Sequence, residues 1–169
     1  MGIILSEVSE VDPFAGICIT SIDQHGAAAG SNSKKRAIQD NGGIVCINDI
    51  IVSVDGHNCQ NETFEEVMGR IIQADGKNVA LTLGREEDNV IVGWPNGVCV
   101  SCRPGDSFGA VAYAAQQADI QYSCSSGSCG TCEQQIISED GSSRFIRPCV
   151  ARVPKVTKPI FVFPSDRFL

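Results

Sequence analysis

Three cysteines lie close together in the C-terminal half of the chain, and their spacing limits the possible folds more than any other feature. Cys124, Cys129 and Cys132 are separated by four and by two residues. One short loop can therefore curl around a small metal centre and supply three thiolates to it. Gly127 and Gly130 lie between them, and glycine lets the backbone adopt positive φ and approach such a centre closely.

The loop of residues 122–132, with the sequence YSCSSGSCGTC, resembles the cluster loop of plant-type [2Fe–2S] ferredoxins. The resemblance covers about residues 89–163. It implies a ferredoxin-type β-grasp fold and a [2Fe–2S] cluster as cofactor. It also implies a one-electron carrier, with no catalytic residues and no enzymatic activity. Plant-type centres have reduction potentials of about −400 mV.

The fourth ligand must come from a distant part of the chain, and Cys149 is the candidate. Its surroundings, Arg147–Ala151 (RPCVA), resemble the Thr-Cys-Val-Ala segment of plant-type ferredoxins. Cys99 and Cys102 also have C-x2-C spacing, but residues i and i+3 of a strand point to opposite faces, so we expect them not to be ligands. The predicted iron ligands are Cys124, Cys129, Cys132 and Cys149.

Only 16 residues separate Cys132 from Cys149, fewer than is usual in that family. We therefore expect a hairpin here, with a strand at 133–138 and a turn at 140–141. Ahead of the loop, apolar runs at 90–94 and 98–102 flank an Asn-Gly pair, which predicts a second hairpin. Asp106 is expected to cap a helix over residues 107–117. Two strands followed by a helix are the opening of a β-grasp.

The N-terminal half has its own pattern of strands and a helix. Alternating apolar and polar residues predict strands at 16–22, 49–54 and 79–83. Thr63 and Glu66 have the spacing of a capping box. The helix that they begin should end near Gly76, and its apolar face comprises Phe64, Val67, Met68, Ile71 and Ile72.

This order of elements resembles a PDZ domain over about residues 1–84. Asn48–Gly56 (NDIIVSVDG) is similar to the Gly-Asp-x-Ile-Leu-x-Val-Asn-Gly stretch of that family, and the first three residues align with its carboxylate-binding loop. The resemblance implies a partly open β-barrel with helices, to which a partner's C-terminal peptide adds as a strand. The implied groove residues are Met1, Gly2, Ile3, Ile4, Phe64 and Met68.

Core packing is the alternative role for the helix residues of this groove. An apolar helical stripe usually packs inside a protein, and we expect that of Val67 and Ile71. If Phe64 lines the groove, it favours an apolar residue two positions before the peptide's end. The segment Ser31–Gly42 is longer than the family has there and is expected to be a solvated loop or a short helix. The apolar C-terminus, Arg167–Leu169, is of the type that such grooves accept, so capture of this terminus by a second molecule is possible.

Charge and cysteine usage support a division into two domains. Residues 1–88 hold 14 acidic and 6 basic residues, a net charge of −8, whereas residues 89–169 hold 6 and 7, a net charge of +1. We therefore predict an α+β chain of two small domains, residues 1–85 and 89–169. There is no dense basic stripe, which makes nucleic-acid binding improbable, and no apolar run long enough to span a membrane. The nine cysteines are an odd number, which disfavours a closed disulfide framework.

The leading hypothesis is an electron carrier that a peptide groove tethers to its redox partner, a reductase or an electron acceptor. One alternative is an interaction module in which the same four cysteines hold a structural zinc ion, although zinc ribbons usually present two C-x2-C pairs. In another, the chain serves a reductase or oxygenase whose nucleotide-binding part is a separate protein. We expect an intracellular location, in the plastid stroma after removal of a transit peptide or else in the mitochondrion or cytoplasm.

Overall fold

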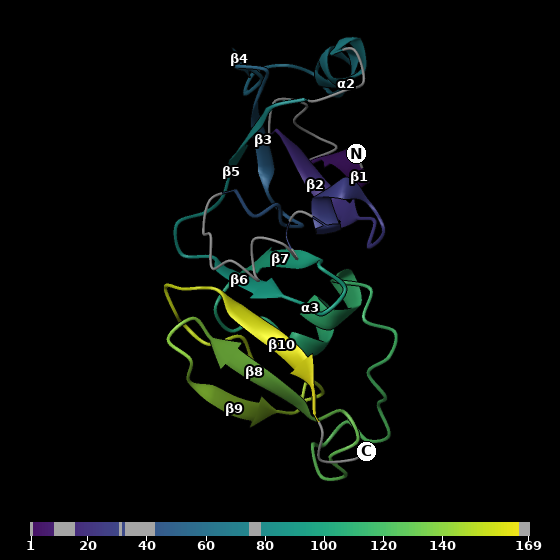
Figure 1. The fold of residues 1–169 in the computed structure, drawn as a ribbon, viewed down its shortest axis with the longest axis vertical. Coiled ribbons are helices and arrows are strands. Elements are labelled where there is room, and N and C mark those ends of the chain that lie inside the picture. The colour runs from purple at the N-terminus through teal and green to yellow at the C-terminus, as the bar shows by residue number, and fades with distance from the viewer. Residues whose placement is uncertain (1, 9–15, 31, 33–42, 75–78, 166–169) are drawn as a thin grey trace.

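The computed structural model describes residues 2–8, 16–30, 32, 43–74 and 79–165, which form a mixed α+β structure. It contains two five-stranded sheets, one above the other along the long axis of the molecule (Figure 1). Met1, most of the predicted 31–42 loop, the predicted helix stop at Gly76 and the C-terminal residues 167–169 lie outside the described residues. No helix in the described part of the chain has the length and apolarity that a membrane crossing requires.

The first sheet is built by the N-terminal half. Its order is β1-β2-β3-β4, and β5 also pairs with β3, all in antiparallel fashion. The predicted strands are confirmed with small shifts in their bounds. The strands are β1 (Ile3–Glu7), β2 (Ile17–Ile22), β3 (Ile50–Val54), β4 (His57–Asn58) and β5 (Leu81–Gly84).

Helix α2 (Phe64–Gln73) begins at the predicted capping box. The Thr63 hydroxyl accepts a hydrogen bond from the Glu66 N–H, and the Glu66 carboxylate accepts one from the Thr63 N–H. Val67 is fully buried in a small core cluster, and Ile71 packs against that cluster. Ile72, which the sequence placed on the same apolar face, is instead 73% exposed, because only one narrow stripe of this helix is covered.

We expect Thr63→Ala to destabilise the chain by about 1 kcal/mol, because the Glu66 N–H at the start of α2 loses its acceptor and the Glu66 carboxylate loses the bond from the Thr63 hydroxyl. Thr63→Ser keeps the hydroxyl and is the matched control. Denaturant unfolding followed by far-UV circular dichroism would measure the difference. Equal midpoints for the two variants would contradict a stabilising role of the cap.

The second sheet is built by the C-terminal half in the order β7-β6-β10-β8-β9. β10 lies between β6 and β8, parallel to β6 and antiparallel to β8. Both predicted hairpins are present, β6–β7 and β8–β9. The elements are β6 (Val90–Gly93), β7 (Cys99–Cys102), α3 (Phe108–Ala114), β8 (Gln134–Ser138), β9 (Ser143–Ile146) and β10 (Ile160–Pro164).

The start of α3 differs from the prediction. Ser107, not Asp106, is the residue at its N-cap, and the helix ends well before residue 117. The Asp106 carboxylate instead accepts a hydrogen bond from the Arg103 N–H, at 2.8 Å, within the turn that follows β7. An aspartate can close a tight turn as well as cap a helix, and the pair Pro104-Gly105 favours the turn here.

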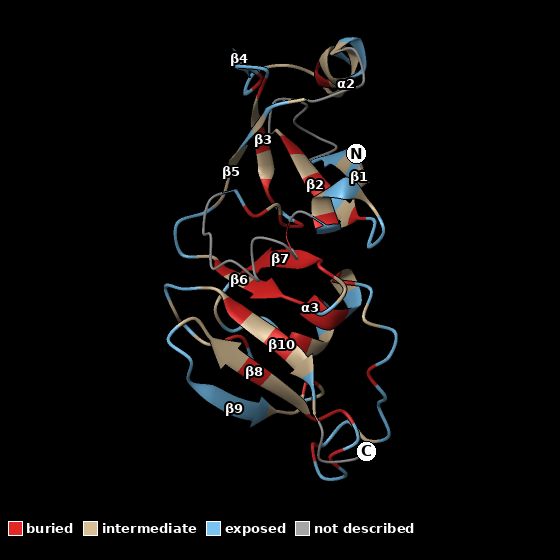
Figure 2. Ribbon diagram, viewed as in Figure 1, coloured by how far each residue is buried: buried red, intermediate tan, exposed pale blue. Residues whose placement is uncertain are grey.

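One hydrophobic core spans both halves. It includes Ile19, Ile22 and Ile47 from the first half, together with Trp94 and Phe108 from the second. Figure 2 shows the buried positions concentrated along β6, β7 and α3, next to the first sheet. Ile47 also forms an isolated parallel bridge with Val100 of β7. The two sheets are therefore packed against each other rather than merely linked by residues 85–89.

A buried ion pair joins two segments of the first half beside this junction. The Asp49 side chain is fully buried, and both of its oxygens accept hydrogen bonds from the Arg85 guanidinium, each at 2.7 Å. The same carboxylate accepts a bond from the Cys46 N–H at 2.8 Å. Arg85 also donates to the carbonyl of Ile44, so that one side chain connects the segment after β5 to the segment before β3.

Candidate functional site

The four predicted ligand cysteines come from two segments at the end of the molecule farthest from the first sheet. Figure 1 shows the chain after α3 running along the side of the second sheet to this end, where the loop of residues 122–132 lies. The second segment is the turn that follows β9, in which the Val150 and Ala151 N–H groups both donate to the Arg147 carbonyl at 2.9 Å. Cys149 lies in this turn.

The cysteines form two pairs. The sulfur atoms of Cys132 and Cys149 are 3.3 Å apart. Cys129 donates its N–H to the sulfur of Cys124 at 3.5 Å. A cluster of two irons needs two thiolates on each iron, and these two pairs could supply them. In the described residues, no three Cys, His, Asp or Glu side chains gather as they would around one ion.

The surroundings of Cys124 favour its thiolate form. The N–H and side chain of Cys129, together with the Ser128 hydroxyl at 3.7 Å, hold the pKa of Cys124 at about 5. Cys149 differs, because burial and then the neighbouring Cys132 thiol raise its pKa. A bound metal would stabilise both thiolates, since metal ligation requires deprotonated sulfur. Cys132 is buried, whereas Cys129 is exposed at the outer rim.

Gly127 lets the loop lie against the second segment. Its φ is +73°, and a Cβ atom at this position would be 2.8 Å from a methyl carbon of Val150. Gly130 also has a positive φ, +78°. Any larger residue at 127 would push the loop away from the turn that carries Cys149, so these glycines fit a cluster held between the two segments.

We expect Gly127→Ala to weaken cluster binding, with several-fold faster release of iron to a chelator. The new methyl group meets Val150, and a left-handed alanine costs about 1–2 kcal/mol. Adding Val150→Ala should recover part of the loss by removing the contact but not the strain. Gly141→Ala is the control, because its φ is +81° but nothing lies within 4 Å of the added carbon. Equal release from both glycine variants would show that loop contact does not matter.

Two charged residues of this site were not identified from the sequence. Glu133 directly follows Cys132 and is only 8% exposed. Arg147, two residues before Cys149, places its Nε 3.4 Å from the Glu133 carboxylate and also donates to the Gly127 carbonyl. The sequence did offer one sign of this pair, because an acidic residue lies next to Cys132 and a basic residue lies close to Cys149.

The remaining cysteines lie elsewhere. Cys99 and Cys102 are buried and join different hydrophobic clusters on opposite faces of β7. Cys46 and Cys59 are buried core residues, and Cys18 is half-buried on β2. None of these five sulfurs belongs to the two pairs described above.

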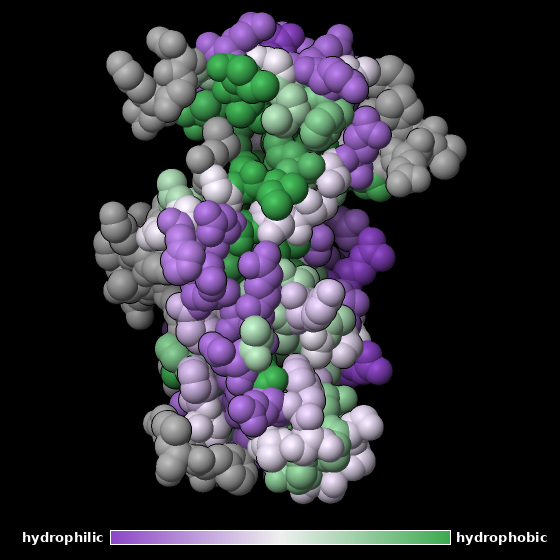
Figure 3. Space-filling model, turned by 90° about the vertical axis from the view of Figure 1, so that its right-hand side faces the viewer, coloured by the Kyte–Doolittle hydropathy of each residue, from purple (hydrophilic) through white to green (hydrophobic). Residues whose placement is uncertain are grey.

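The residues of the predicted peptide groove occupy β1 and α2. β1 is an edge strand among the described residues, with Ile4 61% exposed. Phe64 is half-buried and packs against the small core cluster, whereas Met68 is half-buried outside it. Gly2, with φ of +71°, accepts a hydrogen bond from the Asp23 N–H, which fixes the start of β1. Figure 3 shows apolar surface concentrated over the upper half of this face, where the first sheet lies.

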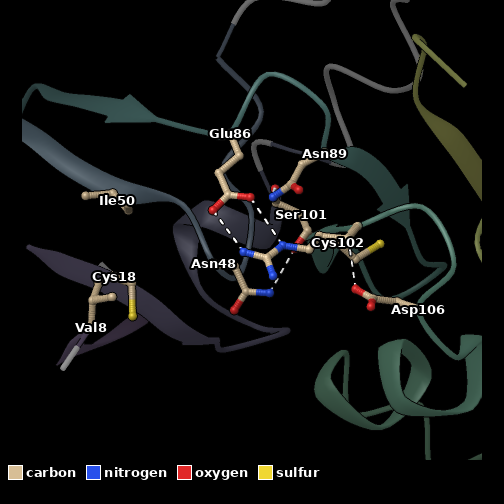
Figure 4. A pocket seen from close by; sticks show the side chains of 10 residues that line it. Val8, Cys18, Asn48, Ile50, Glu86, Asn89, Ser101, Cys102 and Asp106 are labelled. Atoms are coloured by element: carbon tan, nitrogen blue, oxygen red, sulfur yellow. Dashed lines mark hydrogen bonds and ion pairs between the residues drawn. The ribbon is translucent and has the colours of Figure 1, made fainter. Parts of the chain in front are cut away.

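A cleft of about 370 Å³ opens at the junction of the two halves. Figure 4 shows Asn48 and Ser101 in contact there. The exposed pair Arg103–Glu86 also lines this cleft. The Asn48 side chain donates to the Ser101 carbonyl at 2.8 Å, so an amide takes part in holding the sheets together. The φ of Asn48 is +73°, a left-handed conformation that asparagine tolerates better than most residues.

A comparison with protein families identifies the kind of domain at this end of the chain. Residues 94–154 match the model of the 2Fe-2S iron-sulfur cluster binding domain. This range contains all four cysteines of the two pairs, and the cofactor of this ferredoxin-type domain is a [2Fe–2S] cluster. No curated protein and no solved structure matches the chain.

Proposed function

We propose that this chain is a one-electron carrier whose [2Fe–2S] cluster is held by Cys124, Cys129, Cys132 and Cys149. The arrangement of these cysteines in two pairs is the observation that carries the proposal. Domains of the matched family are typical of electron-transfer proteins rather than of enzymes. A redox partner protein is therefore required to deliver or to remove the electron.

The chain contributes the ligands of the cluster, a buried inner side that shields the cluster from water, and an exposed rim through which the electron can pass to a partner. When bound, the cluster takes up and releases a single electron. Cys132, buried against the main core, anchors the inner side of the site, whereas Cys129 lies exposed at the outer rim. Backbone N–H groups that point at sulfur, such as that of Cys129, stabilise negative charge on the thiolates. The exposed rim is the natural place for a partner to approach.

The detailed folds are part of the proposal. The strand order β7-β6-β10-β8-β9, with β10 parallel to β6 and a helix after the first hairpin, supports a β-grasp. The edge strand β1 and the helix α2 support a PDZ-like groove. In this proposal the groove binds the C-terminal peptide of a redox partner and raises the local concentration of the cluster.

A structural zinc site is not favoured. Zinc in such sites is bound by four ligands in a tetrahedron, whereas the cysteines of the described residues lie in two pairs and do not gather in threes. The spacing of Cys124, Cys129 and Cys132 also lacks the two separate C-x2-C pairs that zinc ribbons present.

Spectroscopy of the purified chain tests the electron-carrier proposal. We expect a coloured protein with about two iron and two sulfide per chain. Reduction should bleach the visible bands with uptake of about one electron and give an electron paramagnetic resonance signal. A colourless protein that contains zinc would overturn the proposal.

Peptide binding tests the tether separately. Fluorescent peptides with an apolar residue at the end and another two positions earlier should bind, whereas the same peptides with an amidated C-terminus should not. Binding that is independent of the free carboxylate would refute a PDZ-like groove and leave the electron-carrier proposal untouched.

A further inference from the structure

Arg147 connects three parts of the cluster site through its side chain and its backbone carbonyl. Its Nη1 donates to the carbonyl of Gly127, in the middle of the loop that carries three cysteines. Its Nε lies 3.4 Å from the carboxylate of Glu133, the residue after Cys132. Its own carbonyl accepts the two N–H groups that shape the turn around Cys149. One residue therefore joins the two segments that bear the cysteines.

The partner of Arg147 makes this more than a surface contact. The Glu133 side chain is only 8% exposed, while that of Arg147 is 41% exposed. A carboxylate so deeply buried is costly unless a cation and hydrogen bonds compensate it. The Glu133 N–H also donates to the Gly130 carbonyl at 2.9 Å, so the backbone that carries this side chain is fixed relative to the loop. Arginine, with its rigid planar group, suits a contact with two acceptors at once.

We propose that Arg147 is a positioning residue for the cluster, which clamps the loop against the Cys149 turn and places a positive charge beside the site. Glu133 orients this guanidinium and partly neutralises it. The inference rests on the proposed cluster ligation. Outer contacts of this kind tune both the affinity of a metal site and its potential.

The two roles of Arg147, as a positive charge and as a contact between segments, affect different measurable quantities. Reduction adds one negative charge to the cluster, so a nearby positive charge favours the reduced form and raises the potential. Loss of the charge at Arg147 should therefore lower the potential, and loss of the charge at Glu133 should raise it. Loss of the contact to Gly127 should instead speed iron release, whatever the charge.

The experiment uses the cluster-loaded chain with Arg147→Gln, Arg147→Lys and Glu133→Gln. Arg152→Gln is the matched control, because Arg152 is exposed, lies three residues after Cys149 and has no ion pair among the described residues. Redox titration gives the potential, and transfer of iron to a chelator gives the release rate. Circular dichroism of the cluster-free variants checks the fold.

We expect Arg147→Gln to lower the potential and to release iron about tenfold faster. Arg147→Lys should keep a potential near that of the wild type, because the positive charge remains. It should release iron faster, because a lysine ammonium lacks the planar guanidinium that contacts Gly127 and Glu133 through two nitrogens. Combining Arg147→Gln with Glu133→Gln should bring the potential back towards the wild-type value. Arg152→Gln should change the release rate little.

Equal effects of Arg147→Gln and Arg152→Gln on potential and release would overturn the clamp, since general charge would then explain both. Arg147→Lys keeps the test valid if Arg147→Gln fails to fold, and a wild-type release rate in that variant would also overturn it. A wild-type chain that binds no cluster would defeat the proposed function itself, which is a different result from either of these.

Discussion

Replacing Cys149 with alanine should abolish the visible spectrum of the cluster and leave less than about one tenth of the iron. Cys149 and Cys132 form one of the two pairs, with sulfur atoms 3.3 Å apart. Without Cys149 one iron would keep a single thiolate, and four thiolates are needed to hold the cluster. Cys132→Ala should have the same effect. Iron and sulfide assays on protein purified without oxygen would measure it.

Two other cysteines provide controls for this prediction. Cys102 has C-x2-C spacing with Cys99 and is the ligand that a different reading of the sequence would choose. Its thiol is buried and donates to the Val90 carbonyl at 3.5 Å, and burial raises its pKa to about 12. We expect Cys102→Ala and the half-buried Cys18→Ala to retain iron. Loss of iron in Cys102→Ala, with its fold intact, would refute the assignment of the ligands.

Arg85→Ala should lower the stability of the whole chain by about 3–5 kcal/mol, because it leaves the buried Asp49 carboxylate without a cation. In a chain of this size, that corresponds to a fall in melting temperature of about 10 °C. Arg103→Ala is the control, since the Arg103–Glu86 pair is 71% and 60% exposed. Such an exposed pair contributes about 0–1 kcal/mol. Thermal melting followed by circular dichroism compares the two variants.

The loss in Arg85→Ala should shrink as the pH falls. Burial raises the pKa of Asp49, and Arg85 opposes that rise in the wild type. Without Arg85 the folded-state pKa should be higher still, so the folded chain binds a proton that the unfolded chain does not. Stability from such a group is present at low pH and is lost as the pH rises through the folded-state pKa. A destabilisation that does not change with pH would contradict this explanation.

The sequence predicted local structure well because local signals specify it. Alternation of apolar residues located β2, β3 and β5, the Asn-Gly pair between two apolar runs located the hairpin β6–β7, and the Thr63–Glu66 spacing located the start of α2. The short interval before Cys149 correctly predicted the hairpin β8–β9. Cys99 and Cys102 were expected on opposite faces of a strand, and they are. Each of these features depends on residues that are near one another in the chain.

Contacts between segments that are distant in the sequence could not be predicted in the same way. Ile19 and Ile22 alternate as in any half-buried strand, and nothing in their pattern shows that they face the second half. Asp49 and Arg85 are 36 residues apart, so their pairing depends on how β3 and β5 are brought together. The opposite charges of Arg147 and Glu133 are visible in the sequence, but nothing in the sequence shows that the two side chains pair. The domain bounds at 85 and 89 and the ligand assignment stay predictions.

The common core has an evolutionary consequence. Genes for small domains are often duplicated and rejoined, and a domain survives such shuffling when its apolar residues are covered by its own chain. Here Ile19 and Ile22 pack into one core with Trp94 and Phe108, and Asn48 is bonded to Ser101 across the junction. Either half on its own would expose these apolar residues to water.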